Sequence, residues 1–394
     1  MEQPQPEIEE ARRLSWSDLP GEIIMEILVR VPGRFRTQLK CVNKSLLSLM
    51  EKPGFAREIL DKINNSVDDK DKYRGLVLSE ENNNGGYNRV RSVGLSRGGD
   101  VSLGEFGLPA EDNPLRRKTL HLFNSCHGLV CVAYQGLLYV WNPTTRECRE
   151  VTPVRAPRCL HLVANLHVFA IGYDPVSDDY KIVEAPRMYY KCPNKQLLKV
   201  FSLKNNCWRH VKEFPDRSFP YTISYGTHAT TINEIAHWDA TEKISMIQRK
   251  KRIVYFDFTK EEMGTLPLPY DEDDDYDDCM MTSLAAFSGC LSMIHYNGVT
   301  HDLWIMEEYG VKESWMKLFT IDNLFVEDLR HALIPLCWMG DEIVLGVEGE
   351  PFLIYDPIER THRRLELCGV NPRSTIIPLL DTLISPNATT TTAN

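Results

Sequence analysis

The sequence predicts a small all-α helical bundle followed by an all-β propeller of about six blades, with seven as the alternative count. Two patterns support this division. Apolar residues recur at helical spacing up to about Lys62, whereas beyond Tyr73 they form short β-branched and aromatic runs separated by turn residues. Within the second part, a strand–turn–strand unit recurs about every 50 residues, a period typical of propeller blades.

The composition is that of a globular chain. Its 394 residues are 43% hydrophobic and 25% charged, which suits two or three domains, or one large domain with a small appendage. The 55 acidic and 45 basic side chains leave a net charge of −10, and seven of the acids lie between Asp271 and Asp278. This balance argues against a nucleic-acid partner, which requires a basic face.

The sequence contains neither a membrane-spanning stretch nor a secretory signal that we recognise. The longest uncharged stretch, residues 279–301, contains too many polar side chains for a bilayer, so no membrane partner is predicted. The eleven cysteines are odd in number and include no CxxC pair, and the first residues are acidic rather than basic and apolar. We therefore expect reduced thiols and a location in the cytoplasm, the nucleus or both.

The helical part begins after a tail. Residues 1–16 are expected to be disordered, and the bundle is expected to span residues 17–62. Pro20 suits a first helical position, because its missing N–H would be unpaired there. The helix that follows has apolar stripes on two sides, which predicts burial on both. Pro32 and Gly33 end this helix.

Three further helices complete the bundle. Two short ones are expected around residues 34–40 and 42–50, and Pro53 can open a fourth. A bundle of this size rarely forms a stable core without help, so something else must cover it. Residues 63–72 are polar and charged and form the expected linker.

The C-terminal part repeats a hydrophobic strand, a turn and a second strand. Clear copies occupy residues 139–146, 172–183, 200–208, 255–261, 303–310 and 354–360. The residues that enter five of these turns are separated by 60, 55, 49 and 50 residues: Asn142, Ser202, Asp257, Met306 and Asp356. A small sheet covers both of its faces only by stacking on neighbours, which favours a propeller over a β-sandwich.

The expected propeller spans residues 73–368. At about 50 residues per blade this length gives six blades, or seven if residues 73–123 hold more than one. Residues 369–394 form a C-terminal segment, whose Ala/Thr-rich tail from Ser385 onward is expected to be disordered.

Three pieces of the helical part keep a fixed spacing. They are LPGEIIMEILVRVP at residues 19–32, LKCVNKS at 39–45 and KPGF at 52–55. Together they resemble the F-box family, whose members bind the Skp-type adaptor of a cullin ubiquitin ligase. The resemblance implies these adaptor-binding residues, apolar except for one lysine: Leu19, Pro20, Ile23, Ile24, Ile27, Leu28, Val31, Pro32, Leu39, Val42, Lys44 and Leu49. Spacing alone does not separate adaptor-facing side chains from core side chains.

Two departures from the F-box pattern affect this expectation. Arg36 and Thr37 replace an apolar pair, with Phe35 one place early, and Leu46 stands where tryptophan is usual. They predict weaker adaptor binding than is typical. The alternative is an ordinary helical hairpin packed on the C-terminal part.

The amino-acid sequence of the β repeats resembles that of the plant F-box-associated propeller family. The matching segments are SCHGLVC at 125–131, WNPTTR at 141–146, GYD at 172–174, DDYKIV at 178–183, VFSL at 200–203 with Trp208, and MEEYGVKESW at 306–315. Relatives include pollen S-locus F-box proteins and regulators of defence or hormone pathways, and no residue here selects among these roles. His127 stands where the family usually has Asn or Asp.

No residue cluster predicts chemistry. Cys126 and His127 are neighbours and point to opposite faces of a strand, so we interpret them as a packed cysteine and a turn histidine. Cys159 and His161 make a poor zinc half-site, and the chain contains no phosphate-loop motif. We predict no catalytic residue, no metal and no cofactor.

The charged runs and the tryptophans also receive structural interpretations. Residues 271–278 lack the pattern of a calcium loop and are expected to be a solvated loop, with steering of a basic partner as the functional alternative. Residues 249–252 are expected to be a blade loop, with a nuclear-localisation patch as the alternative. Blade-core positions are expected for Trp141, Trp208, Trp304 and Trp315.

These resemblances imply a non-catalytic substrate receptor of a Skp-cullin-F-box ubiquitin ligase. One end would hold the adaptor and, through it, the cullin, and the other an unknown protein substrate, so that ubiquitin transfer follows from proximity. The alternatives are an adaptor-binding scaffold without ligase function and a propeller enzyme. The substrate-binding residues are unknown from the sequence.

Overall fold

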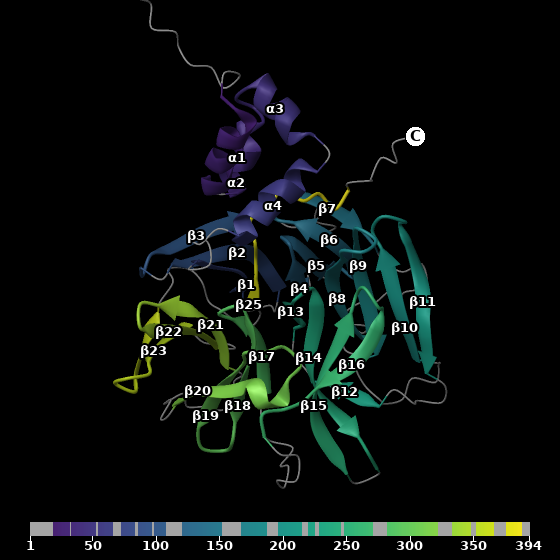
Figure 1. Cartoon of the computed structure of the whole chain (residues 1–394), viewed down its shortest axis with the longest axis vertical. Helices are drawn as coiled ribbons and strands as arrows, with labels where there is room; N and C mark the ends of the chain where they lie inside the picture. The colour runs from purple at the N-terminus through teal and green to yellow at the C-terminus, as the bar shows by residue number, and fades with distance from the viewer. Residues whose placement is uncertain are drawn as a thin grey trace, which may run out of the picture.

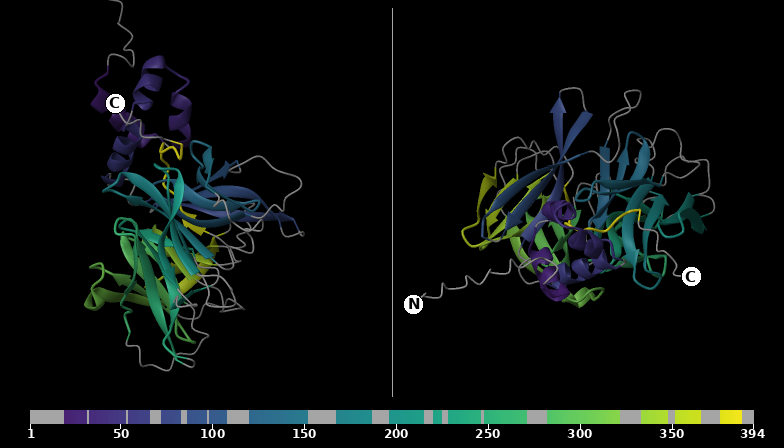
Figure 2. Two further views of the ribbon diagram at one scale, coloured as in Figure 1. Left: turned by 90° about the vertical axis from the view of Figure 1, so that its right-hand side faces the viewer. Right: turned by 90° about the horizontal axis from the view of Figure 1, so that it is seen from above.

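The computed structural model describes sixteen segments of the chain. They are residues 19–31, 33–52, 54–65, 72–82, 86–96, 98–107, 120–151, 167–186, 196–214, 220–224, 228–245, 248–270, 282–321, 333–347, 352–365 and 376–387. A bundle of short helices stands on one side of a ring of β-sheets (Figures 1 and 2). None of the described helices is both long and apolar enough to cross a membrane.

The four expected helices are confirmed. They are α1 (Gly21–Arg30), α2 (Gly33–Leu39), α3 (Lys44–Met50) and α4 (Phe55–Asn65). Pro20 is the N-cap of α1, one position earlier than expected, and Val31 is already extended, as the following Pro32 requires. Asn43 caps α3 by accepting a hydrogen bond from the Ser45 amide at 2.7 Å.

The helical bundle shares its core with the rest of the chain. Its buried side chains are Ile24, Met25, Leu28, Leu46, Met50, Phe55, Ile59 and Ile63, together with Leu383 from near the C-terminus. Leu60 points the other way from α4 and is buried in the propeller. Part of the cover that this small bundle was expected to need therefore comes from the rest of the chain.

Six antiparallel sheets follow in the described part of the chain. The first sheet contains β25 (Ile376–Pro378), β1 (Lys72–Asn82), β2 (Gly86–Ser96) and β3 (Val101–Phe106). The second contains β4 (Leu120–Cys126), β5 (Leu129–Tyr134), β6 (Leu137–Asn142) and β7 (Glu147–Glu150). The third contains β8 (His167–Asp174), β9 (Asp179–Pro186), β10 (Gln196–Ser202) and β11 (Cys207–Phe214). The fourth contains β12 (Tyr221–Ile223), β13 (Thr230–Ile232), β14 (Ile235–Lys243), β15 (Arg249–Asp257) and β16 (Glu262–Leu266). The fifth contains β17 (Thr282–Phe287), β18 (Cys290–Tyr296), β19 (His301–Met306) and β20 (Trp315–Ile321). The sixth contains β21 (Leu333–Met339), β22 (Glu342–Val347), β23 (Phe352–Asp356) and β24 (Thr361–Leu365).

The sheets close into a ring because each buries both faces. In β5, for example, Leu129, Cys131 and Ala133 face the third sheet, whereas the alternating Val130 and Val132 face the first. Separate hydrophobic cores fill the spaces between successive sheets and between the sixth and the first. Strand β25 pairs with β1, so the C-terminal part of the chain completes the first sheet. The architecture is a β-propeller.

The repeat seen in the sequence is a turn between two outer strands of a sheet. Asn142, Asp257 and Asp356 each accept hydrogen bonds through the side chain from the amides two and three residues later, at 2.8–3.3 Å. Four residues after them, Arg146 and Glu261 adopt φ values of 62° and 57°. The recurring residues therefore shape hairpins, and the spacing between them varies with the connecting segments.

The tryptophan prediction is confirmed, and one prediction about charge is wrong. The four tryptophans of that prediction, Trp141, Trp208, Trp304 and Trp315, lie in or against cores between sheets. Residues 249–252 belong to β15 rather than to a loop, because the strand pairs with β14 over this whole stretch. Two of these side chains form ion pairs, Lys251 with Asp239 and Arg252 with Glu242, both at 2.8 Å. The acidic run 271–278 lies outside the described residues.

Side chains near the centre of the ring join neighbouring sheets. The donors and their main-chain acceptors are Ser125 and Pro378, Asn124 and Ile171, Thr230 and Leu284, and Ser283 and Leu333. Asn124 is 1% exposed and makes two further hydrogen bonds, because it also accepts from the Ile171 amide at 2.7 Å and donates to the Thr231 hydroxyl at 2.8 Å. Three sheets meet at this one side chain.

We expect Asn124→Ala to lower the free energy of unfolding by about 3 kcal/mol, because it leaves buried main-chain groups of Ile171 without partners. Urea denaturation measures the change. Asn205→Ala is the matched control, since Asn205 is exposed and its side chain bonds only locally to Ser202. If the two variants lost the same free energy of unfolding, the hydrogen bonds of Asn124 would not be important for joining the sheets.

Candidate functional site

The residues expected to bind an adaptor fall into three groups in the structure. Pro20, Ile23, Val42 and Lys44 are exposed; Leu19, Ile27, Val31, Leu39 and Leu49 are half-buried; Ile24 and Leu28 are buried; and Pro32 lies outside the described residues. Leu28 is fully buried and Ile24 is 8% exposed. The expectation that these two side chains face a partner is corrected, because they point from α1 into the core that it shares with α3 and α4.

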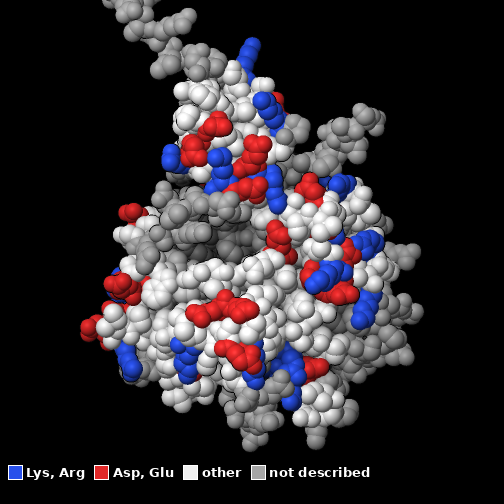
Figure 3. All heavy atoms as spheres, viewed as in Figure 1, with Lys and Arg blue, Asp and Glu red and all other residues white. Residues whose placement is uncertain are grey.

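The helices expose large apolar side chains. Ile23 on α1 is 47% exposed, Phe35 on α2 is 43% exposed and Val42, in the turn before α3, is 64% exposed. Figure 3 shows mostly neutral atoms over the outer part of the bundle, with charged side chains gathered toward the propeller. Exposed apolar side chains that form a patch are typical of a surface that another protein covers. We call Ile23, Phe35 and Val42 the apolar triplet.

The two departures from the family pattern have intramolecular causes. Arg36 is 3% exposed, and its guanidinium donates to the carbonyls of Leu28 at 2.7 Å and Val29 at 2.9 Å, at the C-terminal end of α1. Leu46 is 1% exposed in the core of the bundle. Neither side chain is available to a partner. Arg36 and Leu46 are therefore not part of an exposed docking surface, so they give no reason to expect weaker adaptor binding. Phe35 takes the outward position beside Arg36.

The Cys126–His127 pair lies in a tight turn under α4. His127 and Gly128 have φ values of 51° and 82°, the left-handed pair of a two-residue hairpin turn. Asn and Asp tolerate this conformation well, which explains the family preference at position 127, and histidine also adopts it. Burial and the nearby Arg57 charge lower the pKa of His127 to about 4, and burial raises the pKa of Cys126. Their environment is that of packed side chains.

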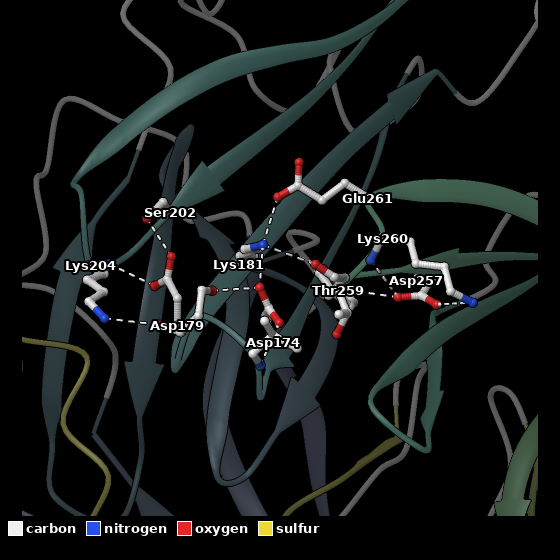
Figure 4. A network of polar contacts seen from close by, with 12 residues as sticks. Asp174, Asp179, Lys181, Ser202, Lys204, Asp257, Thr259, Lys260 and Glu261 are labelled. Atoms are coloured by element: carbon white, nitrogen blue, oxygen red, sulfur yellow. Dashed lines mark hydrogen bonds and ion pairs between the residues drawn. The ribbon is translucent and has the colours of Figure 1, made fainter.

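The DDYKIV segment builds an ionic network between the third and fourth sheets (Figure 4). Lys181 donates to Asp174 and to Glu261 at 2.7 Å each, and to the Phe258 carbonyl at 3.1 Å. Gly172 lies against the Phe258 ring, where a Cβ atom would approach to 2.1 Å. The two motifs GYD and DDYKIV therefore hold neighbouring blades together.

A second polar set crosses the fifth sheet. Thr282, His295, Asp302 and Thr320 are paired one after another across β17, β18, β19 and β20. Asp302 accepts hydrogen bonds from Lys317 at 2.8 Å and from Thr320 at 2.6 Å, while the His295 ring lies against the Tyr270 ring at a tilt of 36°. Among the described residues, no group of three or more His, Cys, Asp or Glu side chains is arranged to hold a metal ion.

Sequence reasoning missed the contacts between the bundle and the propeller. Arg57 on α4 lies 3.8 Å from the centre of the Tyr173 ring, and Arg36 reaches the Asp381 carbonyl at 2.8 Å. These partners are more than 100 residues apart in the sequence, so no local pattern marks them.

The comparisons with known proteins agree with this architecture. A family model described as an F-box associated beta propeller domain matches residues 87–363. An F-box/kelch-repeat protein of Arabidopsis thaliana is 28% identical over 84% of this chain and 85% of its own. The F-box protein CPR1 of Arabidopsis thaliana is 27% identical over 77% of this chain and 73% of its own.

Proposed function

Because the chain belongs to the F-box-associated β-propeller family, we propose that it is the substrate-recognition subunit of a Skp-cullin-F-box ubiquitin ligase. In this proposal the helical bundle binds a Skp-type adaptor and, through it, a cullin. The propeller binds a protein substrate and presents it for ubiquitination and proteasomal degradation. The six sheets are proposed as six blades, and the complex is proposed to act in the cytoplasm, the nucleus or both.

The observation that supports the proposal most is the apolar triplet. The bundle buries other apolar side chains in a core and leaves Ile23, Phe35 and Val42 exposed, and such side chains are the anchors that a helical docking surface offers to a partner. The proposed mechanism is proximity: two binding surfaces on one chain raise the effective concentration of substrate lysines near the ubiquitin-conjugating enzyme. This mechanism needs no catalytic residue in the chain.

Reconstitution with a purified plant Skp-type adaptor and cullin tests the proposal. We expect the full chain to co-elute with both in size-exclusion chromatography, because the exposed triplet supplies the apolar anchors. Adaptor binding without cullin recruitment would favour the scaffold alternative, and no binding by the folded chain would contradict the proposal. Deleting residues 1–62 is a poor control, since Leu60 is buried in the propeller core.

A further inference from the structure

A segment near the C-terminus lies between the helical bundle and the propeller. We call residues 376–387 the C-terminal strap; it is yellow in Figures 1 and 2. Its side chains enter both cores: Leu383 is buried in the bundle, and Ile384 is buried between the second and third sheets. Leu380 packs against both. The strap therefore joins the two cores, as α4 does through Leu60 and Ala56.

Hydrogen bonds fix the strap on the propeller. The Asn142 side-chain amide donates to the carbonyls of Thr382 at 3.2 Å and Ile384 at 2.7 Å. The Thr382 hydroxyl donates to the His127 carbonyl at 2.7 Å. The Thr144 hydroxyl donates to the Asp381 carboxylate at 3.2 Å. The strap is thus held at several points along its length.

The strap also explains a glycine in the SCHGLVC motif. A Cβ atom on Gly128 would lie 2.5 Å from the Leu380 carbonyl oxygen and 2.4 Å from the Thr382 hydroxyl. The main chain of the strap therefore rests directly on this turn. A residue larger than glycine would push the strap off the second sheet.

Arg36 fixes the strap to the bundle. Its guanidinium donates at 2.8 Å to the Asp381 carbonyl, in addition to its bonds to the carbonyls of Leu28 and Val29. The planar guanidinium presents several donors in fixed directions, which suits three carbonyls from two segments. One buried side chain therefore ties the end of α1 to the strap.

We infer that Arg36 and the C-terminal strap fix the orientation of the helical bundle on the propeller, with Arg36 acting as a positioning residue. The contact of α4 through Leu60 and Arg57 anchors one end of the bundle. Arg36 on α2 supplies a second anchor, and without it the bundle would pivot as one unit about the α4 contact. For ubiquitin transfer, which rests on the proposed function, a fixed orientation keeps the substrate surface at one place relative to the adaptor.

Distance measurements on the full chain test this inference. Fluorophores are introduced as unnatural amino acids at Ser48 on α3 and at Val299 on the fifth sheet, both exposed. We expect a single narrow population by single-molecule energy transfer in the unsubstituted chain and loss of that single population in Arg36→Met. Arg36→Lys should restore it in part. Arg30→Met is the matched control, because Arg30 is exposed and pairs only with Glu26.

A single narrow population in folded Arg36→Met would overturn the inference. If that variant does not fold, Thr144→Val decides, because it removes a strap bond from the propeller side and leaves Arg36 intact. It should broaden the distribution, and an unchanged distribution would again overturn the inference.

A second readout separates orientation from stability and from the proposed function. Arg36→Met should bind the adaptor as tightly as the unsubstituted chain, because Arg36 is buried away from partners, while ubiquitin transfer to a bound substrate falls. A parallel loss of adaptor affinity would show a merely structural role. If the unsubstituted chain binds no adaptor, the proposed function fails, and the distance distributions still test the inference.

Discussion

The double substitution Ile23→Asp with Val42→Asp is expected to lower adaptor affinity at least about 100-fold while the chain stays folded. Both side chains are exposed, at 47% and 64%, so charging them disturbs no core. In the complex each carboxylate would be buried against an apolar partner surface, which is costly for an unpaired charge. Titration calorimetry with a purified Skp-type adaptor measures the affinity, and circular dichroism confirms folding.

Propeller residues of the same chemistry provide the control. Val176 and Ile358 are 82% and 77% exposed and lie in turns of the propeller. The substitutions Val176→Asp and Ile358→Asp add the same charges outside the helices, so adaptor affinity should not change. A comparable loss in these variants would place the docking surface elsewhere. Leu28→Asp is unsuitable for this purpose, because Leu28 is fully buried and the bundle would unfold.

The features that the sequence predicts well are local ones. Helix α1 is marked by apolar residues within one or two turns and by flanking prolines, and the β6–β7 hairpin is marked by Asn142, which bonds its own neighbours. The buried strand β5 is a continuous apolar run because both of its faces meet another sheet. These signals need no knowledge of distant residues.

The features that the sequence misses depend on distant partners. Arg36 looks like a charged residue in a docking surface, yet its main-chain acceptor at Asp381 is 345 residues away. The Ala/Thr-rich end of the chain predicts a disordered tail, yet Ser385 bonds to Glu147 in the second sheet. Periodicity has no means of indicating either contact. For the same reason it left open which residues of α1 face a partner and which face the core.

Lys181→Met is expected to give the largest loss of stability, about 3–5 kcal/mol in the free energy of unfolding. The substitution keeps the length of the side chain but leaves Asp174, 3% exposed, without its ionic partner. Glu261 also loses Lys181 but keeps its ion pair with Arg209. Removing one member of a buried ion pair is costly, because the remaining charge cannot be solvated. Urea denaturation followed by tryptophan fluorescence measures the change.

Lys260→Met is the matched control on the neighbouring turn. Lys260 pairs with Asp257 at 3.4 Å, but its side chain is 72% exposed, so water replaces the lost partner and the expected change is below about 1 kcal/mol. Figure 4 shows both lysines in one view. If the two variants lose equal stability, burial is not what makes the Lys181 network important.

The pH dependence of stability gives an independent test of the same network. Burial alone would raise the pKa of Asp174, but hydrogen bonds from Lys181, Ser177 and the Val176 amide outweigh it and lower the pKa to about 2. An unfolded aspartate titrates near 3.9, so this stabilisation is complete above about pH 5 and is lost as the pH falls through the folded pKa of about 2. In Asp174→Asn the contribution is absent at every pH. Its stability should therefore fall less steeply than that of the unsubstituted chain between pH 5 and pH 2, and parallel curves would mean that Asp174 is not ionised in this network.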